Sequence, residues 1–294
     1  MHTRLFHLHA LSALHCGTGQ SAGVVDLPIA RARATQLPLV PGSSVRGVCR
    51  EEVTGRDPRA AVTLFGPERI DSDQQSFAGA LAVGDAHLLA LPVRALAGIV
   101  CFVTAPFILR RYAQDLARAG LSVPKLPAAP NIGTAWVTSG SVNCIQGTRT
   151  LVLEDLDLNA QESPEATAWA TQIAATVHPN DVDAQTDLAA RFAILPDDVL
   201  GFLSETATEI RARIAIDPDT GTVKRGALWY EENLPAETLL WGVYALSDSM
   251  TQEARRAAQD LARYLPASGT LLQLGGKAGV GRGLVRLLTQ EVPT

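Results

Sequence analysis

The sequence predicts an α+β fold, a sheet domain with inserted segments, on the basis of three observations. Apolar segments short enough for strands, such as residues 99–104, alternate along the 294-residue chain with segments of helical periodicity, such as residues 106–120. The turn sequence DPDTG at residues 217–221 separates two strand-like segments and predicts a β-hairpin. No fixed-period repeat of the kind that marks solenoid proteins is present.

The elements expected along the chain follow from periodicity and from Gly and Pro signals. In the first strand, apolar residues alternate with His7 and His9, so one face is only partly apolar. Residues 161–190 show little periodicity and are interpreted as a mobile or peripheral insertion. We expect strands over residues 5–14, 80–93, 99–104, 143–158, 238–245, 271–274 and 284–288, helices from Ser43 or Ser44 and over 106–119, 197–207 and 251–265, a loop over 121–138, and hairpin strands over 211–216 and 222–230.

Composition excludes several classes of protein. Hydrophobic residues make up 47% of the chain, but no apolar run reaches the roughly 18 residues that a membrane span needs. The histidine-containing N-terminus is unlike a secretory signal, so no membrane contact is expected. The four cysteines are widely spaced and form no C-x-x-C pair, which favours a reduced, cytoplasmic protein without structural zinc.

The net charge of −5 argues against a generic basic nucleic-acid-binding protein, but the charge is unevenly distributed. Residues 1–150 contain 14 Lys and Arg against 9 Asp and Glu, a net charge of +5, whereas residues 151–294 contain 11 against 21, a net charge of −10. A polyanion site is therefore expected mainly on the N-terminal half, unless the asymmetry has no functional meaning. Head-to-tail stacking of copies would bring the opposite charges together.

A first candidate anion site follows Pro41 and Gly42. Ser43 or Ser44 can cap a helix whose apolar residues form one stripe, namely Val45, Val48, Cys49 and Val53. Arg46 and Arg50 lie four positions apart on a second face, so backbone N–H groups, a hydroxyl and two guanidinium groups would converge on a phosphate. An ordinary capped helix with solvated arginines is the alternative.

A second candidate is the glycine-rich loop GGKAGVGRG at residues 275–283. Gly275 and Gly276 would let the backbone approach a ligand closely, and Lys277 and Arg282 supply positive charge. The loop is not a nucleotide-binding P-loop, because it lacks G-x-x-x-x-G-K-[ST] and a strand follows it. A plain tight turn is the alternative.

Asp26 is the strongest candidate for chemistry. Its carboxylate lies in an apolar segment that Pro28 ends, so it needs either exposure or a partner. Near a phosphodiester it could hold a divalent ion or assist proton transfer from a ribose 2′-hydroxyl, whereas an exposed loop aspartate is the alternative. His15 could act as an acid or base near neutral pH or position RNA, or it could be a hydrogen-bonded histidine at a strand end.

Several segments, taken in their order, resemble one known family. They are LHCGTGQSAGVVDLPI (residues 14–29), LPLVPGSSVRGVCR (37–50), LFGP (64–67), AGALAVGDAHLL (78–89), GALWYEENLP (226–235) and LLQLGGKAGVGRGLVRLL (271–288). Each segment alone is weakly specific, but the ordered set resembles the RAMP superfamily of CRISPR proteins. Within it, the set is most similar to the repeated backbone subunit of the type III-B (Cmr) RNA-guided effector.

The resemblance implies a ferredoxin-like (RRM-like) antiparallel sheet core with an inserted thumb hairpin and helical insertions. Residues 1–294 would form a single RAMP domain, in which residues 161–235 are an insertion that includes the thumb. The implied protein is a metal-dependent endoribonuclease that binds guide crRNA and cleaves complementary single-stranded target RNA at regular intervals. A guide-binding filament subunit that does not cut is the alternative, and a cytoplasmic protein that binds another anion at residues 43–50 is a third interpretation.

The resemblance also implies roles for single residues. Asp26 matches the aspartate that cleavage requires, with Mg²⁺ or Mn²⁺ as the divalent ion, and Tyr230 and Glu231 would lie near the cleaved phosphate. Whether Glu231 or Glu232 is the matching acid, and which position answers to the family's tyrosine, stays open, and a strand end with solvated acids is the alternative.

Further contacts are implied away from the cleaved phosphate. Lys224 and Arg225 on the thumb would meet backbone phosphates, and the loop at residues 275–283 would lie on the guide RNA. The implied partners are crRNA, target RNA, copies of the same chain in a helical filament and other Cmr subunits.

Overall fold

The fold is known from a computed structural model, which describes residues 2–19, 25–67, 77–250, 255–256 and 258–289. The helices are α1 (Gly42–Arg56), α2 (Pro58–Phe65), α3 (Pro106–Arg118), α4 (Pro164–Val177), α5 (Val182–Ala190), α6 (Asp197–Thr206), α7 (Ala258–Ala262) and the 3₁₀ turn η1 (Ala278–Val280). The strands are β1 (His2–Ala10), β2 (Leu39–Val40), β3 (Leu81–Val83), β4 (Ala86–Ala95), β5 (Ile99–Thr104), β6 (Thr134–Val137), β7 (Thr150–Leu153), β8 (Leu156–Glu162), β9 (Phe192–Ile194), β10 (Glu209–Ile216), β11 (Val223–Asn233), β12 (Leu239–Leu246), β13 (Ser249–Met250), β14 (Arg255–Arg256), β15 (Leu271–Gln273) and β16 (Leu284–Thr289). The mixed α+β class is confirmed, and no helix in these described ranges is long and apolar enough to cross a membrane.

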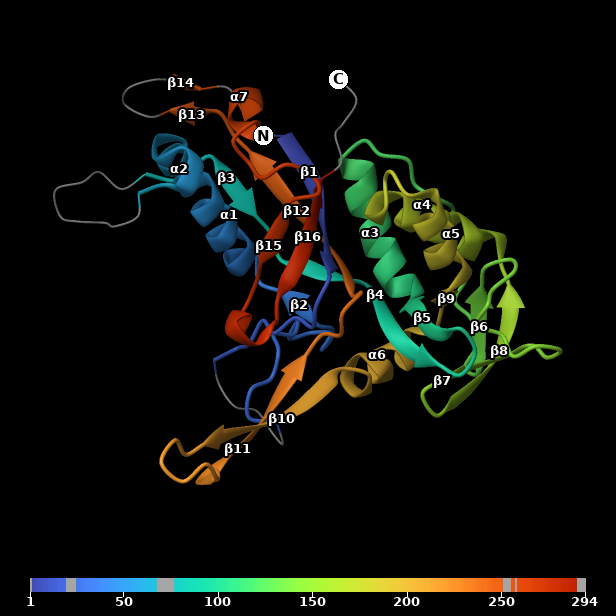
Figure 1. Ribbon diagram of the computed structural model, residues 1–294. Coiled ribbons are helices and arrows are strands. Elements are labelled where there is room, and N and C mark those ends of the chain that lie inside the picture. The colour runs from blue at the N-terminus through green and yellow to red at the C-terminus, as the bar shows by residue number, and fades with distance from the viewer. Residues whose placement is uncertain (1, 20–24, 68–76, 251–254, 257, 290–294) are drawn as a thin grey trace.

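One twelve-stranded sheet forms the framework of the molecule (Figure 1). Its order is β15-β16-β1-β12-β4-β5-β9-β6-β8-β7, with β2 beside β4 and β3 beside β12. In the first half, β16, β1, β12 and β4 are antiparallel to their neighbours, so the N-terminal strand lies inside the sheet. Because the sheet is larger than a ferredoxin-like core, that finer topology stays a prediction.

The second half of the sheet closes on itself. β4 continues past β12 and pairs with β5, and the order β5-β9-β6-β8-β7 returns to β4 where Ala95 pairs with Leu153. These six strands therefore form a barrel-like ring. α3 contacts β4, and α4 contacts β6 and β9, so both helices cover this part of the molecule.

β1 is buried on both faces, and the face that the sequence shows to be only partly apolar buries its two histidines. Its side chains from residue 5 to residue 10, including His7 and His9, are at most 3% exposed. Nε2 of His7 lies 2.8 Å from the Tyr112 hydroxyl, and Nε2 of His9 lies 2.6 Å from a carboxylate oxygen of Glu237. Burial lowers the pKa of His7 to about 4, so this imidazole is neutral at neutral pH.

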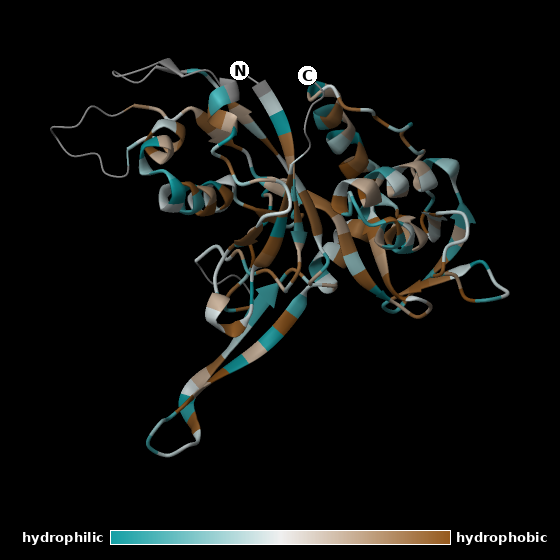
Figure 2. Ribbon diagram, turned by 45° about the horizontal axis from the view of Figure 1, so that its top comes forward, coloured by the Kyte–Doolittle hydropathy of each residue, from teal (hydrophilic) through white to brown (hydrophobic). Residues whose placement is uncertain are grey.

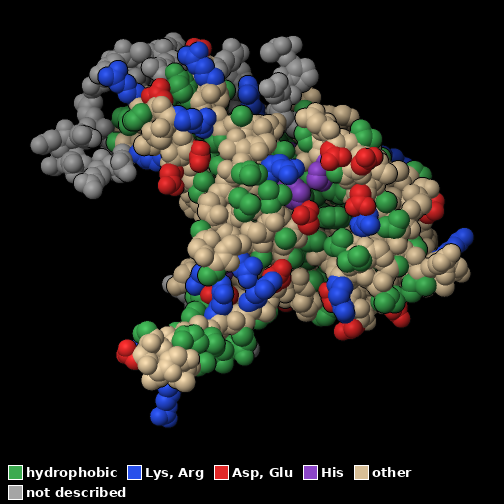
Figure 3. All heavy atoms as spheres, viewed as in Figure 1, with side chains coloured by type: hydrophobic (Ala, Val, Ile, Leu, Met, Phe, Trp, Pro, Cys, Tyr) green, Lys and Arg blue, Asp and Glu red, His purple; other side chains and the backbone are tan. Residues whose placement is uncertain are grey.

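The predicted hairpin is confirmed as β10 and β11, which stand out from the body of the molecule (Figures 1 to 3). In its antiparallel register, Arg213 is opposite Trp229 and Arg211 is opposite Glu231. Several of its apolar side chains are about half exposed: Ile210, Ile214, Ile216 and Leu228. The hairpin is thus joined to the body only at its base.

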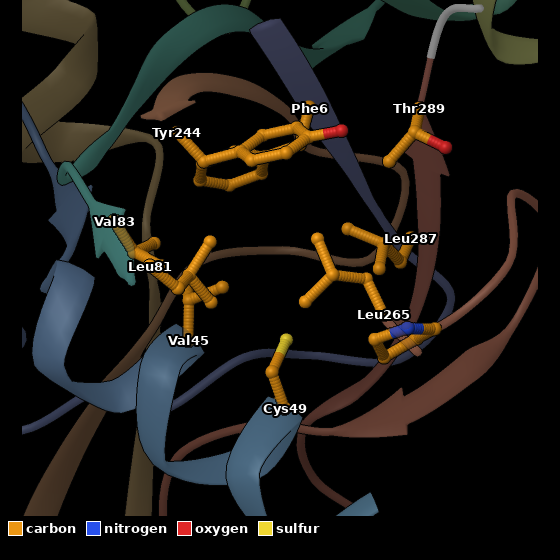
Figure 4. Close-up of a pocket in the computed structure, with 10 residues that line it drawn as sticks. Phe6, Val45, Cys49, Leu81, Val83, Tyr244, Leu265, Leu287 and Thr289 are labelled. Atoms are coloured by element: carbon orange, nitrogen blue, oxygen red, sulfur yellow. The ribbon is translucent and has the colours of Figure 1, made fainter. Parts of the chain in front are cut away.

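α1 packs its predicted apolar stripe against the sheet. Val45, Cys49 and Val53 are at most 6% exposed, although Val48 is only partly buried. Figure 4 shows the side chains of Val45 and Cys49 facing Leu81 and Leu287 across a small apolar pocket. The helical spacing read from the sequence is therefore confirmed.

The predicted serine cap of α1 is wrong. The helix begins at Gly42, after Pro41, and neither Ser43 nor Ser44 makes a capping hydrogen bond. The carboxylate of Asp85 takes this role, because its Oδ1 accepts from the N–H of Gly42 at 2.8 Å. A Cβ at Gly42 would lie 2.6 Å from a backbone oxygen of the neighbouring chain segment, so the close approach requires glycine.

Three other expectations are corrected. Residues 121–138 are not all loop, because β6 pairs with β8 and β9. Residues 161–190 contain all of α4 and all of α5, and α4 belongs to the core, since Trp169 and Ile173 are fully buried. The predicted helix over residues 251–265 is present only as α7, while residues 255–256 form β14 and residues 251–254 and 257 lie outside the described residues.

Candidate functional site

Segments far apart in the sequence meet at the base of the hairpin, where lysine and arginine side chains gather (Figure 3). β11 pairs with β10 on one edge and with residues 25–29 on the other, where the N–H of Leu27 donates to the Tyr230 carbonyl at 3.1 Å. The glycine-rich loop joins them because the N–H of Gly276 donates to the His15 carbonyl at 2.9 Å. Eight predicted residues are brought together in this way: His15, Asp26, Tyr230, Glu231, Gly275, Gly276, Lys277 and Arg282.

Asp26 is exposed, and one of its carboxylate oxygens is fixed. Oδ2 accepts from the backbone N–H of Tyr230 at 2.8 Å, which anchors the side chain to β11. Oδ1 has no partner in the part of the chain that the structure describes. The side chain of Tyr230 is 41% exposed nearby. Asp26 can therefore offer one oriented oxygen to a ligand at the surface.

His15 is buried, and its tautomer follows from its hydrogen bond. Nδ1 lies 2.7 Å from the carbonyl oxygen of Glu232, and a carbonyl only accepts, so Nδ1 carries the hydrogen. In the neutral ring the lone pair is then on Nε2. A Cβ on Gly17 would lie 2.8 Å from this nitrogen, so glycine there leaves room for the ring.

Glu231 is the centre of a charged network. Its side chain is 1% exposed, and Oε1 accepts from Nε1 of Trp229 at 2.9 Å and from Nζ of Lys277 at 3.0 Å. Oε2 accepts from Nε of Arg213 at 3.2 Å. Burial by itself raises the pKa of Glu231, but the hydrogen bonds from Trp229, Lys277 and Arg213 outweigh burial and lower it to about 2. Glu231 is therefore ionised at any physiological pH.

Glu232 has a different environment. Its Oε1 accepts from Arg31 at 2.5 Å, and its Oε2 accepts from the backbone N–H of Ile29 at 3.1 Å. Arg31 also donates to the carbonyl oxygens of Gln36 and Ser204. This ion pair fixes the segment that follows Asp26 onto the hairpin base, so of the two glutamates only Glu231 reaches the glycine-rich loop.

A comparison with known proteins decides the family. A model of the RAMP superfamily matches residues 7–286. The chain belongs to the RAMP superfamily. The resemblance found from the ordered motifs is thereby confirmed over nearly the whole length of this RAMP protein.

Individual relatives are similar over their whole length. The CRISPR system Cmr endoribonuclease Cmr4 of Pyrococcus furiosus is 32% identical over 295 aligned residues, which cover 99% of this RAMP chain and 97% of the relative. The crystal structure of oligomeric Cmr4 from P. furiosus superimposes with a TM-score of 0.75, at 26% identity in the structural alignment, and covers all of both chains. A chain in the cryo-EM structure of the type III-B Cmr-beta bound to cognate target RNA shares the fold alone, with a TM-score of 0.71 at 19% identity, over 98% of this chain and 97% of that one.

The first predicted anion site of this RAMP protein is arranged differently from the expectation. Arg46 and Arg50 do lie together, but they donate to the carbonyl oxygens of Phe65 and Gly66, at the end of α2, at 2.6 and 3.1 Å. The carboxylate of Asp85 already accepts a hydrogen bond from the N–H of Gly42 at the start of α1. A phosphate at this helix end would therefore meet a negative charge, and RNA binding by Ser43, Ser44, Arg46 and Arg50 stays a prediction.

Lys224 and Arg225 lie apart from the hairpin base. Both are exposed, and they precede Glu231 by six or seven residues on the extended strand β11. At about 3.3 Å per residue, they are roughly 20 Å from that glutamate. They can contact only a ligand that also extends along the hairpin.

Sequence reasoning missed three residues at the base of the hairpin. Arg213 and Trp229 hold Glu231, and Arg31 holds Glu232. The signal for the first two was available in the hairpin. Arg213 is opposite Trp229, and Glu231 is two residues further along β11, so all three side chains lie on the same face. Arg31 could not be paired from the sequence, because its partner is 201 residues away.

The residues of this site do not fit a metal ion held by the protein. The described residues contain no group of three or more His, Cys, Asp or Glu side chains that could hold one. Asp26 has one oxygen committed to Tyr230, and the carboxylates of Glu231 and Glu232 are committed to cations. Asp26 alone could offer one oxygen, so Mg²⁺ or Mn²⁺ at this position would have to take most of its ligands from RNA phosphates and water.

Gly275→Ala is expected to disrupt the glycine-rich loop. Gly275 has a φ of +74°, and a Cβ there would lie 2.2 Å from the His15 carbonyl oxygen, so the loop would have to move. We expect a loss of about 1–3 kcal/mol in the free energy of unfolding, measured by urea denaturation. Gly279→Ala is the matched control, because a Cβ there meets open space and its φ is outside the left-handed region. Equal effects of the two substitutions would contradict this assignment.

Proposed function

We propose that this RAMP protein is a backbone subunit of a type III-B RNA-guided effector, which binds guide crRNA and cleaves complementary single-stranded target RNA. The observation that carries the proposal is the exposed carboxylate of Asp26, anchored to β11 beside a cationic, glycine-rich loop. The 32% identity to an endoribonuclease of a Cmr system supports it over the full length of the chain. A subunit that only holds guide RNA would not need this carboxylate.

The chemistry is a transesterification within the target strand. The free oxygen of Asp26 accepts the proton of a target 2′-hydroxyl as the 2′-oxygen attacks the adjacent phosphorus. The bond from phosphorus to the 5′-oxygen breaks, and that oxygen takes a proton from water. The products are a 2′,3′-cyclic phosphate and a 5′-hydroxyl. The hairpin holds the target backbone splayed, so that the 2′-oxygen can reach an in-line position.

The remaining predicted residues support binding and positioning. Lys277 and Arg282 in the glycine-rich loop, and Lys224 and Arg225 on the hairpin, contact backbone phosphates, which suits recognition without base readout. Tyr230, whose N–H anchors Asp26, and His15, which lies against the glycine-rich loop, help to orient the RNA. The divalent ion implied by the resemblance is proposed as an aid that the RNA phosphates and water would mainly hold, because the protein offers it one oxygen.

The wider architecture is proposed on the same basis. Residues 1–294 form a single RAMP domain with residues 161–235 as its insertion, and the order β16-β1-β12-β4 with α1 and α7 between strands supports a ferredoxin-like core. Copies of the chain stack in a helical filament with other Cmr subunits, as the oligomeric crystal form of a relative supports. The widely spaced cysteines support a cytoplasmic location.

The spacing of the cuts tests this function. In the complex assembled with guide RNA, each subunit should cut once, so the cuts should recur at a constant interval set by the filament. Two targets of unrelated sequence, each complementary to its own guide, should give the same interval in high-resolution mapping of the product ends. Cuts that follow the target sequence, or a target that stays intact, would contradict the proposal.

A further inference from the structure

We propose that Lys277 and Arg213 form a two-cation clamp for a phosphodiester group of single-stranded RNA, and that Glu231 positions the two cations and transfers no proton. This inference rests on the proposed RNA binding. It adds Arg213 to the site and gives Glu231 a positioning role in place of a catalytic one.

The three side chains are arranged with the negative charge behind the positive ones. Glu231 is 1% exposed, whereas the side chains of Arg213 and Lys277 are 29% and 34% exposed. Each cation contacts a different oxygen of the same carboxylate, at 3.2 Å for Nε of Arg213 and 3.0 Å for Nζ of Lys277. The buried carboxylate thus lets two like charges lie side by side, and the group keeps a net charge of +1.

Arg213 keeps the part of its side chain that suits phosphate. Its contact with Glu231 uses only Nε, and its two terminal nitrogens have no partner in the described residues. Paired guanidinium nitrogens bind phosphate oxygens in a bidentate way. The edge left free is therefore the edge that recognises a phosphodiester.

Lys277 is held in place by a backbone conformation that lysine rarely adopts. Its φ of 70° lies in the left-handed region, where glycine would be less strained, and glycines are frequent in this loop. This conformation places Nζ on Glu231 and 6.0 Å from the centre of the Trp229 ring. A strained residue that is also fixed by two partners is typical of a functional position.

The clamp also lies beside Asp26. The N–H of Tyr230 anchors Asp26, and the next residue of β11 is Glu231. A phosphate bound by Lys277 and Arg213 would therefore lie on the same segment of RNA backbone as the ribose that Asp26 faces. The low pKa of Glu231 agrees with a fixed negative charge and with no proton to donate.

Binding of a single-stranded oligoribonucleotide at several salt concentrations tests the clamp. Arg213→Ala and Lys277→Ala should each reduce the slope of log Kobs against log salt by about 0.7, the loss of one phosphate contact. Lys277→Arg should keep the slope. Arg94→Ala is the matched control, because its Nε also lies 3.2 Å from a glutamate oxygen, that of Glu154 in the turn between β7 and β8, and it should change nothing.

The Glu231→Gln variant decides whether Glu231 acts only through its charge or positions the two cations. Removal of a negative charge from a polyanion site should tighten binding if Glu231 acts only through its charge. If it positions the cations, binding should weaken several-fold, and Glu231→Gln should have no further effect in the Arg213→Ala/Lys277→Ala background. Unchanged slopes in the two cation variants, or tighter binding by Glu231→Gln, would overturn the clamp.

Cleavage separates this inference from the proposed function. A positioning role predicts that Glu231→Gln lowers the rate without changing the shape of its pH profile, whereas loss of a proton-transfer group would remove one limb. If Asp26→Asn still cuts while the salt slopes change as expected, the clamp stands and the proposed chemistry fails. If Asp26→Asn abolishes cutting while the salt slopes of the cation variants stay unchanged, the proposed chemistry stands and only the clamp is wrong.

Discussion

Asp26→Asn should reduce target cleavage by at least about 100-fold, because general-base catalysis commonly contributes 10²–10⁴-fold and an amide cannot accept the proton. The substitution keeps the shape of the side chain and an oxygen that can accept from the N–H of Tyr230, so residues 25–29 should stay on β11. Binding of guide and target RNA should be nearly unchanged. Single-turnover cleavage in the assembled complex, with binding measured on the same preparation, checks both expectations.

A matched variant distinguishes chemistry from position. Asp85→Asn changes another carboxylate that accepts from a backbone N–H at 2.8 Å, but at the start of α1. It should leave the rate of cutting within a few-fold of the unsubstituted chain. Retained cleavage by Asp26→Asn, or an equal loss by Asp85→Asn, would show that Asp26 has no special part in the reaction.

Trp169→Ala should destabilise the protein by about 3–5 kcal/mol, the usual cost of deleting a buried aromatic side chain. Trp169 is fully buried in α4, its Nε1 donates to the Lys125 carbonyl at 3.1 Å, and its ring lies 6.0 Å from that of Tyr112. A peripheral insertion would tolerate the same change. Urea unfolding followed by circular dichroism measures the loss.

Phe202→Ala is the control for this substitution, because Phe202 is a large residue on α6 that is 56% exposed. We expect a change of no more than about 0.5 kcal/mol there. A loss below about 1 kcal/mol for Trp169→Ala would mean that α4 does not belong to the core.

The sequence predicted elements whose signals are local. The hairpin was recognised from its turn, and α3 from Pro106 at its start and apolar residues at helical spacing. α4 was missed because three of its six buried residues are alanines, namely Ala166, Ala170 and Ala174, and alanine contributes little to an apolar pattern. Contacts between residues that are far apart in the sequence could not be predicted.

The candidate site shows the same limit. Asp26, His15, Glu231 and Lys277 were selected from motifs, and the structure brings them together at the hairpin base. The cap of α1 was assigned to a serine because the actual acceptor, Asp85, is 43 residues away. Two partners of Glu231, Arg213 and Trp229, follow from the register of the hairpin, whereas Lys277 comes from a loop that no local signal pairs with this strand.

One measurement tests the central claim most directly: cleavage of a target RNA that carries a single 2′-deoxyribose at one scissile position. If Asp26 activates the target's own 2′-hydroxyl, that cut should disappear while the neighbouring cuts, made by other subunits, continue at their normal rates. The remaining products should end in a 2′,3′-cyclic phosphate. Normal cutting at the deoxy position would contradict the account, because the attacking oxygen would then have to come from water.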